Sequence, residues 1–356
     1  MNTRQVFQLM VEREASDLYL RTKAFPRARI NGKVETIGKE PLGKDEMTAI
    51  TNLLLGSEKR RKKFLDNLDI DFIHEEEGVG RFRINIFTQR GSPAIVARHV
   101  HTEVKSFEEL NLPIDVLKMF CEEPKGLFIT SGPAGSGKST TIATMIDYIN
   151  TMSAKHVITL EDPIEFLFTD KKSIINQREL GLDVRSYPMA LKYVTQQSPD
   201  IIFIGNIRDE ATMRAAITAT ELGTFVLTTF HTVNAVQTIV RIVNFFPPHL
   251  HNEIRMQLSM ILKGTISLRL LPRKDGKGRI PAYETMVVTP TISRLIREGH
   301  IREIQNYIDE GELFGMKCFK KSLVDLVTSG LVDENDARQY ADSKDEFNLE
   351  LKGLKH

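Results

Sequence analysis

The residues of this chain that are best suited to chemistry form the glycine-rich segment Gly132-Pro133-Ala134-Gly135-Ser136-Gly137-Lys138-Ser139, which fits the pattern G-x-x-x-x-G-K-[ST]. An apolar run precedes the segment, and Thr140 opens a helical run after it. In such a P-loop, backbone N–H groups turn toward phosphate oxygens, the lysine reaches the β- and γ-phosphates, and the serine hydroxyl is a Mg²⁺ ligand. A chance match in a chain of this length is expected roughly 0.01 times, which disfavours a glycine-rich loop that binds nothing.

Three carboxylates form a second group, in the segment Glu161-Asp162-Pro163-Ile164-Glu165 that directly follows an apolar run. Carboxylates beside a P-loop can hold Mg²⁺-bound water or orient an attacking water, the two tasks that nucleotide hydrolysis needs beyond phosphate binding. The alternative is an acidic loop that caps a strand. His231 also follows an apolar run, where its imidazole either senses the γ-phosphate or has a structural role only.

The elements that must position these residues alternate between buried strands and helices. Three apolar runs stop abruptly in polar residues, as buried parallel strands do, and helical stretches alternate with them. The apolar runs lie at 157–160, 201–204 and 225–229, and the helical stretches at 187–197 and 209–221. This pattern predicts an α/β fold with a RecA-like core, whose ligand-facing edge is formed by the C-terminal ends of the strands. Past Pro247-Pro248 we expect a mostly helical region with an exposed turn at 274–278.

The first hundred residues predict a smaller α+β domain. We expect a tight hairpin at Asn31-Gly32, because this dipeptide suits the turn between two strands. The other elements expected are a helix at 3–13, a strand at 16–20, a helical run near 44–66 and strands within 70–100. Residues 101–113 differ in composition and end in a proline, which places a linker there.

One strand of this domain carries an unusually basic face. Phe82, Ile84 and Ile86 share one side of the strand, so the alternate positions, among them Arg81 and Arg83, lie together on the other. That face is either solvated or offers arginines to the phosphates of a neighbouring subunit's nucleotide.

Composition limits the classes of partner. The chain has 356 residues with 48 Lys and Arg against 47 Asp and Glu, so it has no overall excess of charge to hold nucleic acid. No run approaches the length of a transmembrane helix and the N-terminus lacks a signal-peptide core, so we expect a cytoplasmic protein. Cys121 and Cys318 are far apart in apolar helical contexts, which favours buried free thiols over a disulfide or a metal site.

Together these residues resemble the secretion ATPase superfamily. The resemblance rests on the P-loop, the acidic segment, and the segments 177–183, 198–209 and His231-Thr232. Within the superfamily, the segments 18–32, 295–299 and 315–342 resemble the twitching-motility retraction ATPases of type IV pili, the PilT/PilU family, and the likeness covers essentially the whole chain.

The resemblance implies a PAS-like domain over 1–100 and a RecA-like P-loop ATPase domain over 114–356, helical from about 290 onward. It also implies a homohexamer that couples hydrolysis of Mg²⁺-bound ATP to pilus disassembly, peripheral at the inner membrane, with a platform protein and a paralogous retraction ATPase as partners. By carry-over, Glu165 is the catalytic carboxylate and Glu161 joins Ser139 at the metal. The N-terminal arginines offered to a neighbouring nucleotide are then Arg81, Arg83 and Arg98.

The chain departs from the family pattern where hydrolysis is concerned. The family has Gly-Glu-x-Arg-Asp after the strand that corresponds to 201–204, and this chain has Asn206 in place of the glutamate. A neutral amide cannot act as a base and favours Mg²⁺-bound water less than a carboxylate does. Further departures near the same surface are Gln196, Ala211, Leu222 and Thr224.

Three interpretations stay open at this point. The first is a motor subunit that hydrolyses ATP slowly, with Glu165 as the remaining base. The second is a nucleotide-binding regulatory subunit that depends on an active paralogue. The third, a nucleic-acid motor or a pilus assembly ATPase, is disfavoured by the near-neutral charge and by the lack of cysteine pairs at zinc-binding spacing.

Overall fold

The computed structural model describes residues 3–30, 32–100 and 103–353. The chain divides into two compact units between Glu103 and Val104. Residues 104–113, expected to be linker, belong to the second unit, because Phe107 and Leu112 are buried in its core. Asn31 of the expected hairpin turn and residues 101–102 lie outside the described residues.

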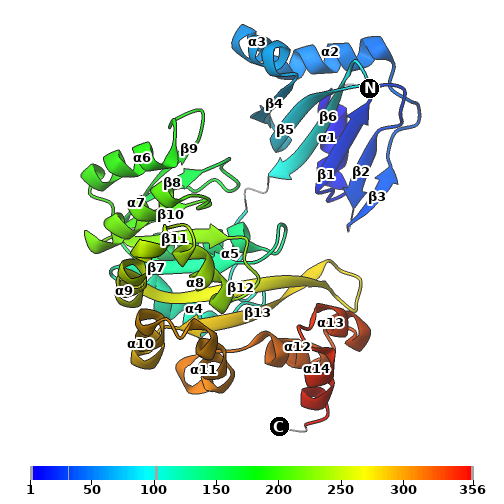
Figure 1. The fold of residues 1–356 in the computed structure, drawn as a ribbon. Coiled ribbons are helices and arrows are strands. Elements are labelled where there is room, and N and C mark those ends of the chain that lie inside the picture. The colour runs from blue at the N-terminus through cyan, green and yellow to red at the C-terminus, as the bar shows by residue number, and fades with distance from the viewer. Residues whose placement is uncertain (1–2, 31, 101–102, 354–356) are drawn as a thin grey trace. The chain divides into compact units, whose positions relative to one another are not determined.

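The first unit is an antiparallel sheet of six strands, in the order β3-β2-β1-β6-β5-β4, with three helices (Figure 1). The helical run expected near 44–66 is two helices, because Gly56 ends α2 with a φ of 63°. Phe82, Ile84 and Ile86 are fully buried, as the alternation in β5 predicts. The elements are α1 (Thr3–Glu12), β1 (Asp17–Arg21), β2 (Arg27–Ile30), β3 (Lys33–Thr36), α2 (Lys44–Leu55), α3 (Glu58–Asn67), β4 (Asp69–Glu76), β5 (Gly80–Gln89) and β6 (Ser92–Val100).

The second unit is built on a sheet of seven strands in the order β13-β12-β7-β11-β10-β8-β9, in which all neighbours pair in parallel except β12 and β13. Its strands are β7 (Gly126–Ser131), β8 (His156–Glu161), β9 (Ile174–Glu179), β10 (Ile201–Ile204), β11 (Phe225–Phe230), β12 (Leu262–Pro272) and β13 (Arg279–Val287). The expected buried parallel strands are thus confirmed as β8, β10 and β11.

Helices cover this sheet and extend the unit at its C-terminal end (Figure 1). They are α4 (Ile114–Cys121), α5 (Lys138–Met152), α6 (Tyr187–Val194), α7 (Glu210–Glu221), α8 (Ala235–Val243), α9 (His251–Ile261), α10 (Pro290–Glu298), α11 (Ile304–Glu310), α12 (Phe319–Thr328), α13 (Glu334–Tyr340) and α14 (Lys344–Leu351). No helix in the described part of the chain is long and apolar enough to cross a membrane.

The expectation of a mostly helical chain past residue 247 is wrong for β12 and β13. These strands form a long antiparallel hairpin, and the exposed turn at 274–278 connects them. Residues 264–268 of β12 are buried in succession, so this strand lacks the period-two alternation by which a half-exposed strand is recognised in a sequence.

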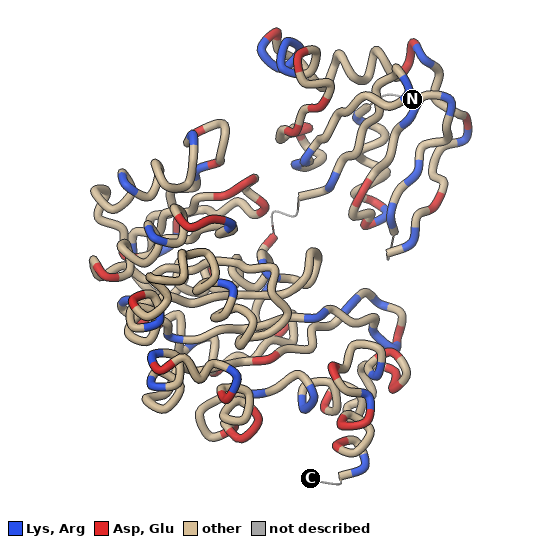
Figure 2. The backbone as a smooth tube through the Cα atoms, viewed as in Figure 1, with Lys and Arg blue, Asp and Glu red and all other residues tan. Residues whose placement is uncertain are grey.

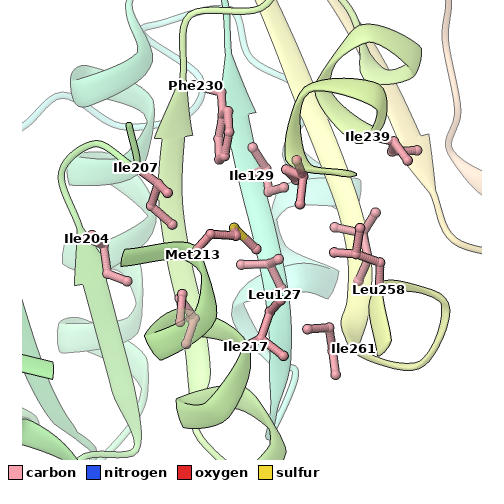
Figure 3. Packing of buried hydrophobic residues seen from close by; sticks show 14 of the residues in the cluster. Leu127, Ile129, Ile204, Ile207, Met213, Ile217, Phe230, Ile239, Leu258 and Ile261 are labelled. Atoms are coloured by element: carbon pink, nitrogen blue, oxygen red, sulfur yellow. The ribbon is translucent and has the colours of Figure 1, made fainter. Parts of the chain in front are cut away.

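The core of the second unit lies on both sides of its sheet. On one side, Leu127 and Ile129 of β7 pack with Met213 and Ile217 of α7 and with Leu258 of α9 (Figure 3). Both cysteines are free and buried, Cys121 in α4 and Cys318 just before α12, as expected from their apolar contexts. Burial raises the pKa of both thiols, that of Cys318 to about 11.

Gly264 offers a test of how closely the sheet packs against α4. A Cβ at this position would lie 2.6 Å from the Met286 carbonyl oxygen and would also collide with the Phe120 ring. We expect Gly264→Ala to destabilise the second unit by about 1–3 kcal/mol, because overpacking a full core forces shifts of that cost. Thermal unfolding measures the effect, with Gly43→Ala as the control, since a Cβ at Gly43 has no atom within 4 Å. Equal melting temperatures for both variants would contradict the packing described.

Candidate functional site

The P-loop connects the end of β7 to the first residue of α5. Gly132 has a φ of 145°, and a Cβ there would lie 2.5 Å from both the Leu268 carbonyl oxygen and the Ser136 hydroxyl oxygen. Gly137 precedes the helix with a φ of 97°, in the left-handed region that glycine adopts without strain. Pro133, Ala134 and Gly135 are exposed at the tip, so backbone groups of the loop are open to a ligand at the start of α5.

Lys138 folds back over this loop. Its Nζ donates hydrogen bonds of 2.8 Å to the carbonyl oxygens of Gly132 and Pro133, and the residue is only 7% exposed. Burial lowers the pKa of the Lys138 ammonium to about 8, an effect that the nearby Glu165 carboxylate partly opposes. The loop therefore holds a dehydrated cation that gains strongly from an anionic partner.

Glu161 ends β8 as a buried carboxylate. Its Oε1 accepts hydrogen bonds from the Thr159 hydroxyl at 2.6 Å and from Gln177 Nε2 at 3.4 Å. Burial raises the pKa of Glu161 to about 7, although these hydrogen bonds favour the charged form. Thr159 lies two residues before Glu161 in the same strand, so both side chains share one face of the sheet.

The acidic loop after β8 is fixed by the carboxylates of Glu161 and Glu179. Glu161 Oε2 accepts from the Glu165 backbone N–H at 3.5 Å, and Glu179 Oε2 accepts from that of Ile164 at 3.1 Å. The loop presents the Glu165 side chain as an exposed group whose charge acts on Lys138. Glu165 thus lies beside the P-loop, while Glu161 lies beneath it in a buried position.

The two expected metal ligands lie together. Ser139 and Glu161 line one small cavity with Ala143, Phe166 and Phe203. A hydroxyl and a carboxylate match the oxygen ligands that Mg²⁺ takes when it is bound mainly through nucleotide phosphates and water. No cluster of three His, Cys, Asp or Glu side chains at metal-binding distance occurs among the described residues.

Asn206 and His231 form a pair at the same edge. The Asn206 side-chain nitrogen lies 3.2 Å from His231 Nε2 and donates to it when that nitrogen carries no proton. Burial, followed by the charges of Lys138 and Arg208, lowers the pKa of His231, which favours the neutral ring. Where the sequence resemblance expects a carboxylate, this edge therefore carries an uncharged amide and a neutral imidazole.

The three N-terminal arginines belong to the first unit, and Arg83 and Arg98 pair with carboxylates of the same unit. Arg83 pairs with Asp71 through two guanidinium nitrogens, and Arg98 Nε lies 3.0 Å from Asp17 Oδ1. Arg83 and Arg98 are also neighbours across β5 and β6. Arg81 lies on the same face of β5, two residues before Arg83.

Two further buried polar groups support this edge and were not singled out by the sequence analysis. The Tyr187 hydroxyl is buried near Asp162 and Arg208, and burial raises its pKa. Glu284 of β13 accepts a hydrogen bond of 2.9 Å from the backbone N–H of Ala235, the first residue of α8, and so fixes the helix that follows the His231 loop. Neither lies in a local sequence motif, because Tyr187 comes near Asp162 and Arg208, and Glu284 near Ala235, only in the folded chain.

The fold and this edge define a P-loop protein with a RecA-like core. Residues 4–330 match the family described as type II/IV secretion system proteins, and the chain belongs to this family. It is 38% identical over 352 residues to the type IV pilus ATPase PilU of Pseudomonas aeruginosa, covering 99% of this chain and 92% of that relative. It is also 38% identical to the type IV pilus retraction ATPase PilT of the same organism, covering 98% of this chain and 100% of PilT.

Solved structures support the same assignment. A crystal structure of the pilus retraction motor PilT with bound ADP matches 97% of this chain and 98% of its own, with a TM-score of 0.87 at 40% identity. The ATPase DotB of Legionella pneumophila matches 94% of each chain with a TM-score of 0.83 at 23% identity, which shows a shared fold.

The low pKa of Lys138 predicts a pH dependence of nucleotide binding. Phosphates favour the charged ammonium and raise its pKa in the complex, so affinity is full below about pH 8 and falls by up to about ten-fold per pH unit above it. Binding should also take up protons in this range, because Lys138 is partly deprotonated in the free chain and is protonated in the complex. Calorimetry with ATP in two buffers of different ionisation enthalpy measures both effects. An affinity independent of pH above about 8, without proton uptake, would contradict this account of Lys138.

Proposed function

We propose that this chain is a P-loop ATPase subunit of a type IV pilus retraction motor. The observation that carries the proposal is the meeting of Lys138, Ser139 and the two carboxylates Glu161 and Glu165 at one edge of the second unit. Phosphate binding and the placement of water are the two requirements of ATP hydrolysis, and these side chains supply both. The likeness to PilT and PilU over nearly their full lengths supports pilus retraction as the work to which hydrolysis is coupled.

The roles of the residues follow from their surroundings. The loop over 132–139 and the first turn at Thr140 receive the phosphates, and Lys138 exchanges its carbonyl contacts for phosphate oxygens. Ser139 and Glu161 would hold Mg²⁺, which would neutralise negative charge at the phosphates. Glu165, exposed beside the lysine, orients or deprotonates the attacking water. His231 hydrogen-bonds to the γ-phosphate as a neutral group.

A second candidate function is favoured by Asn206. The Asn206 side chain is neutral and lies within hydrogen-bonding distance of His231. It stands where the family has a glutamate, so one carboxylate that would contact the water ligands of Mg²⁺ is missing. A subunit of this kind binds nucleotide and turns it over slowly, and acts as an accessory of an active paralogue in the same machine. PilU and PilT, two relatives of this chain, are both proteins of Pseudomonas aeruginosa, so related ATPases of this kind occur in one organism.

The assembly that we propose is a homohexamer, cytoplasmic and peripheral at the inner membrane, where it acts on a platform protein of the pilus. In this arrangement a PAS-like N-terminal domain supplies Arg81, Arg83 and Arg98 to the nucleotide of a neighbouring subunit. Arg83 and Arg98 would then exchange the carboxylates of Asp71 and Asp17 for phosphate. We expect no nucleic acid among its partners, because the chain has a near-neutral net charge.

Restoring the carboxylate at position 206 separates the two candidate functions. A misplaced catalytic group commonly costs about 10²–10⁴-fold in rate, so Asn206→Glu should raise kcat substantially if Glu165 and its surroundings are intact. Steady-state phosphate release measures this, and adding Glu165→Ala to the variant should abolish the gain. If Asn206→Glu brings no increase while ATP binding is unchanged, the accessory subunit is the better description.

The oligomeric state tests the contribution of a neighbour. Light scattering across a range of concentrations should give the mass of six chains, since a closed ring lets the arginines of each subunit reach the next nucleotide. Arg83→Ala should keep that mass and lose hydrolysis, because Asp71 is half exposed and tolerates the loss of its partner. A chain that stays monomeric with saturating Mg-ATP would exclude arginines supplied from a neighbour.

A further inference from the structure

Helix α3 carries a dense group of basic residues (Figure 2). Its five basic residues follow one another from Lys59 to Lys63, and its two acidic residues are Glu58 and Asp66, so the helix has a net charge of +3. None of its side chains is buried. The core of the first unit therefore does not account for this composition.

The two arginines of α3 contact other residues of the first unit, whereas its three lysines point to solvent. Arg60 lies 4.3 Å from the centre of the Phe72 ring and donates to the Ile73 carbonyl oxygen, and Arg61 pairs with Glu58 at 3.1 Å. The side chains of Lys59, Lys62 and Lys63 are exposed and form no ion pair within the described ranges. These three lysines thus present their charges to solvent.

Exposed leucines accompany these lysines. Leu65 is 71% exposed, and Leu68, the residue that ends the helix, is 57% exposed. Leu68 has a φ of 57°, a left-handed conformation that glycine or asparagine adopts at lower cost. Helical spacing places Lys59, Lys62 and Leu65 on the side opposite Arg60 and Phe64. Leu68 is exposed and has a backbone conformation that costs leucine more than glycine. The presence of leucine at this position is therefore not explained by the stability of the unit.

We propose that α3 binds the surface of a membrane that contains anionic lipids. Lysines with long apolar stems contact the phosphate-bearing headgroups, while Leu65 and Leu68 enter the boundary of the acyl region. The proposal rests on the peripheral location given under the proposed function and identifies the element that produces it.

An acidic protein is the other surface that a basic helix fits, and composition decides against it. Protein interfaces are enriched in aromatic residues and arginine and are depleted in lysine. In α3 the two arginines have partners in their own unit, and the outward side chains are three lysines and Leu65 beside Glu58, Asp66 and Asn67. This is the combination found in helices that lie on membrane surfaces.

The expected strength is modest for one chain and larger for an assembly. Each lysine near an anionic surface increases binding about five-fold, so the three lysines together account for on the order of 100-fold. Glu58 and Asp66 on the exposed side reduce this effect. Several copies of the helix held in one ring multiply the affinity, because the second and later contacts form within one complex.

Co-sedimentation of the full chain with vesicles tests the proposal. We expect binding to vesicles of phosphatidylcholine mixed with phosphatidylglycerol, weakened by salt, and no binding to phosphatidylcholine alone. The variant Lys59→Glu, Lys62→Glu, Lys63→Glu should lose binding by at least about 100-fold. The matched control Lys33→Glu, Lys39→Glu, Lys44→Glu makes the same change of charge at exposed lysines of the same unit and should keep binding.

A second variant tests the leucines. Leu65→Ser, Leu68→Asn should keep the salt-sensitive binding and lose the fraction that resists salt, and asparagine suits the left-handed backbone at position 68. Wild-type chain that ignores anionic vesicles, or equal binding by the lysine variant and its control, would overturn the proposal. Retention on immobilised polyglutamate without binding to vesicles would overturn it in favour of an acidic protein. ATPase rates measured without vesicles should be the same in all variants, so a failure of membrane binding is distinct from a failure of the proposed motor function.

Discussion

The parallel pairing of four central strands is the constraint on which the candidate site depends. β7, β11, β10 and β8 run in one direction and lie in register, so the segments that follow them emerge at one edge of the sheet. The P-loop, the acidic loop, Asn206 and His231 are far apart in the sequence and meet there for this reason. The fully buried strands β7 and β11 fix the positions from which these segments leave.

Burial sets the electrical character of that edge. It moves the pKa of Lys138 down and the pKa of Glu161 up, so both groups titrate closer to neutral pH than they do in water. A nucleotide phosphate would stabilise the charged form of the first group, and a divalent cation would stabilise the charged form of the second. In the proposed site, Mg-ATP would bring both charges at once. Asn206 and His231 add polarity to this edge without adding charge.

The sequence was sufficient to predict the α/β fold, the P-loop and the meeting of its lysine with the acidic loop, because each depends on a local pattern placed by parallel strands. It did not predict β12 as a strand, because the continuous burial of β12 removes the alternation by which a strand is recognised. Nor could it predict contacts between distant segments. Glu284 reaches the N-terminus of α8 across 49 residues, and the Asn206–His231 pair spans 25. The pairing of Arg83 with Asp71 depends on the register of β4 and β5, which the turn between them sets.

The burial of both cysteines has a practical consequence for following the motions of this protein. A thiol reacts as the thiolate, and the raised pKa values of Cys121 and Cys318 leave almost none of it at neutral pH, behind a layer of packed side chains. The native chain therefore gives a nearly silent background for maleimide chemistry. One cysteine introduced on the surface of each unit would accept a fluorophore or spin label selectively, and the distance between the two labels would then report movement between the units during a nucleotide cycle.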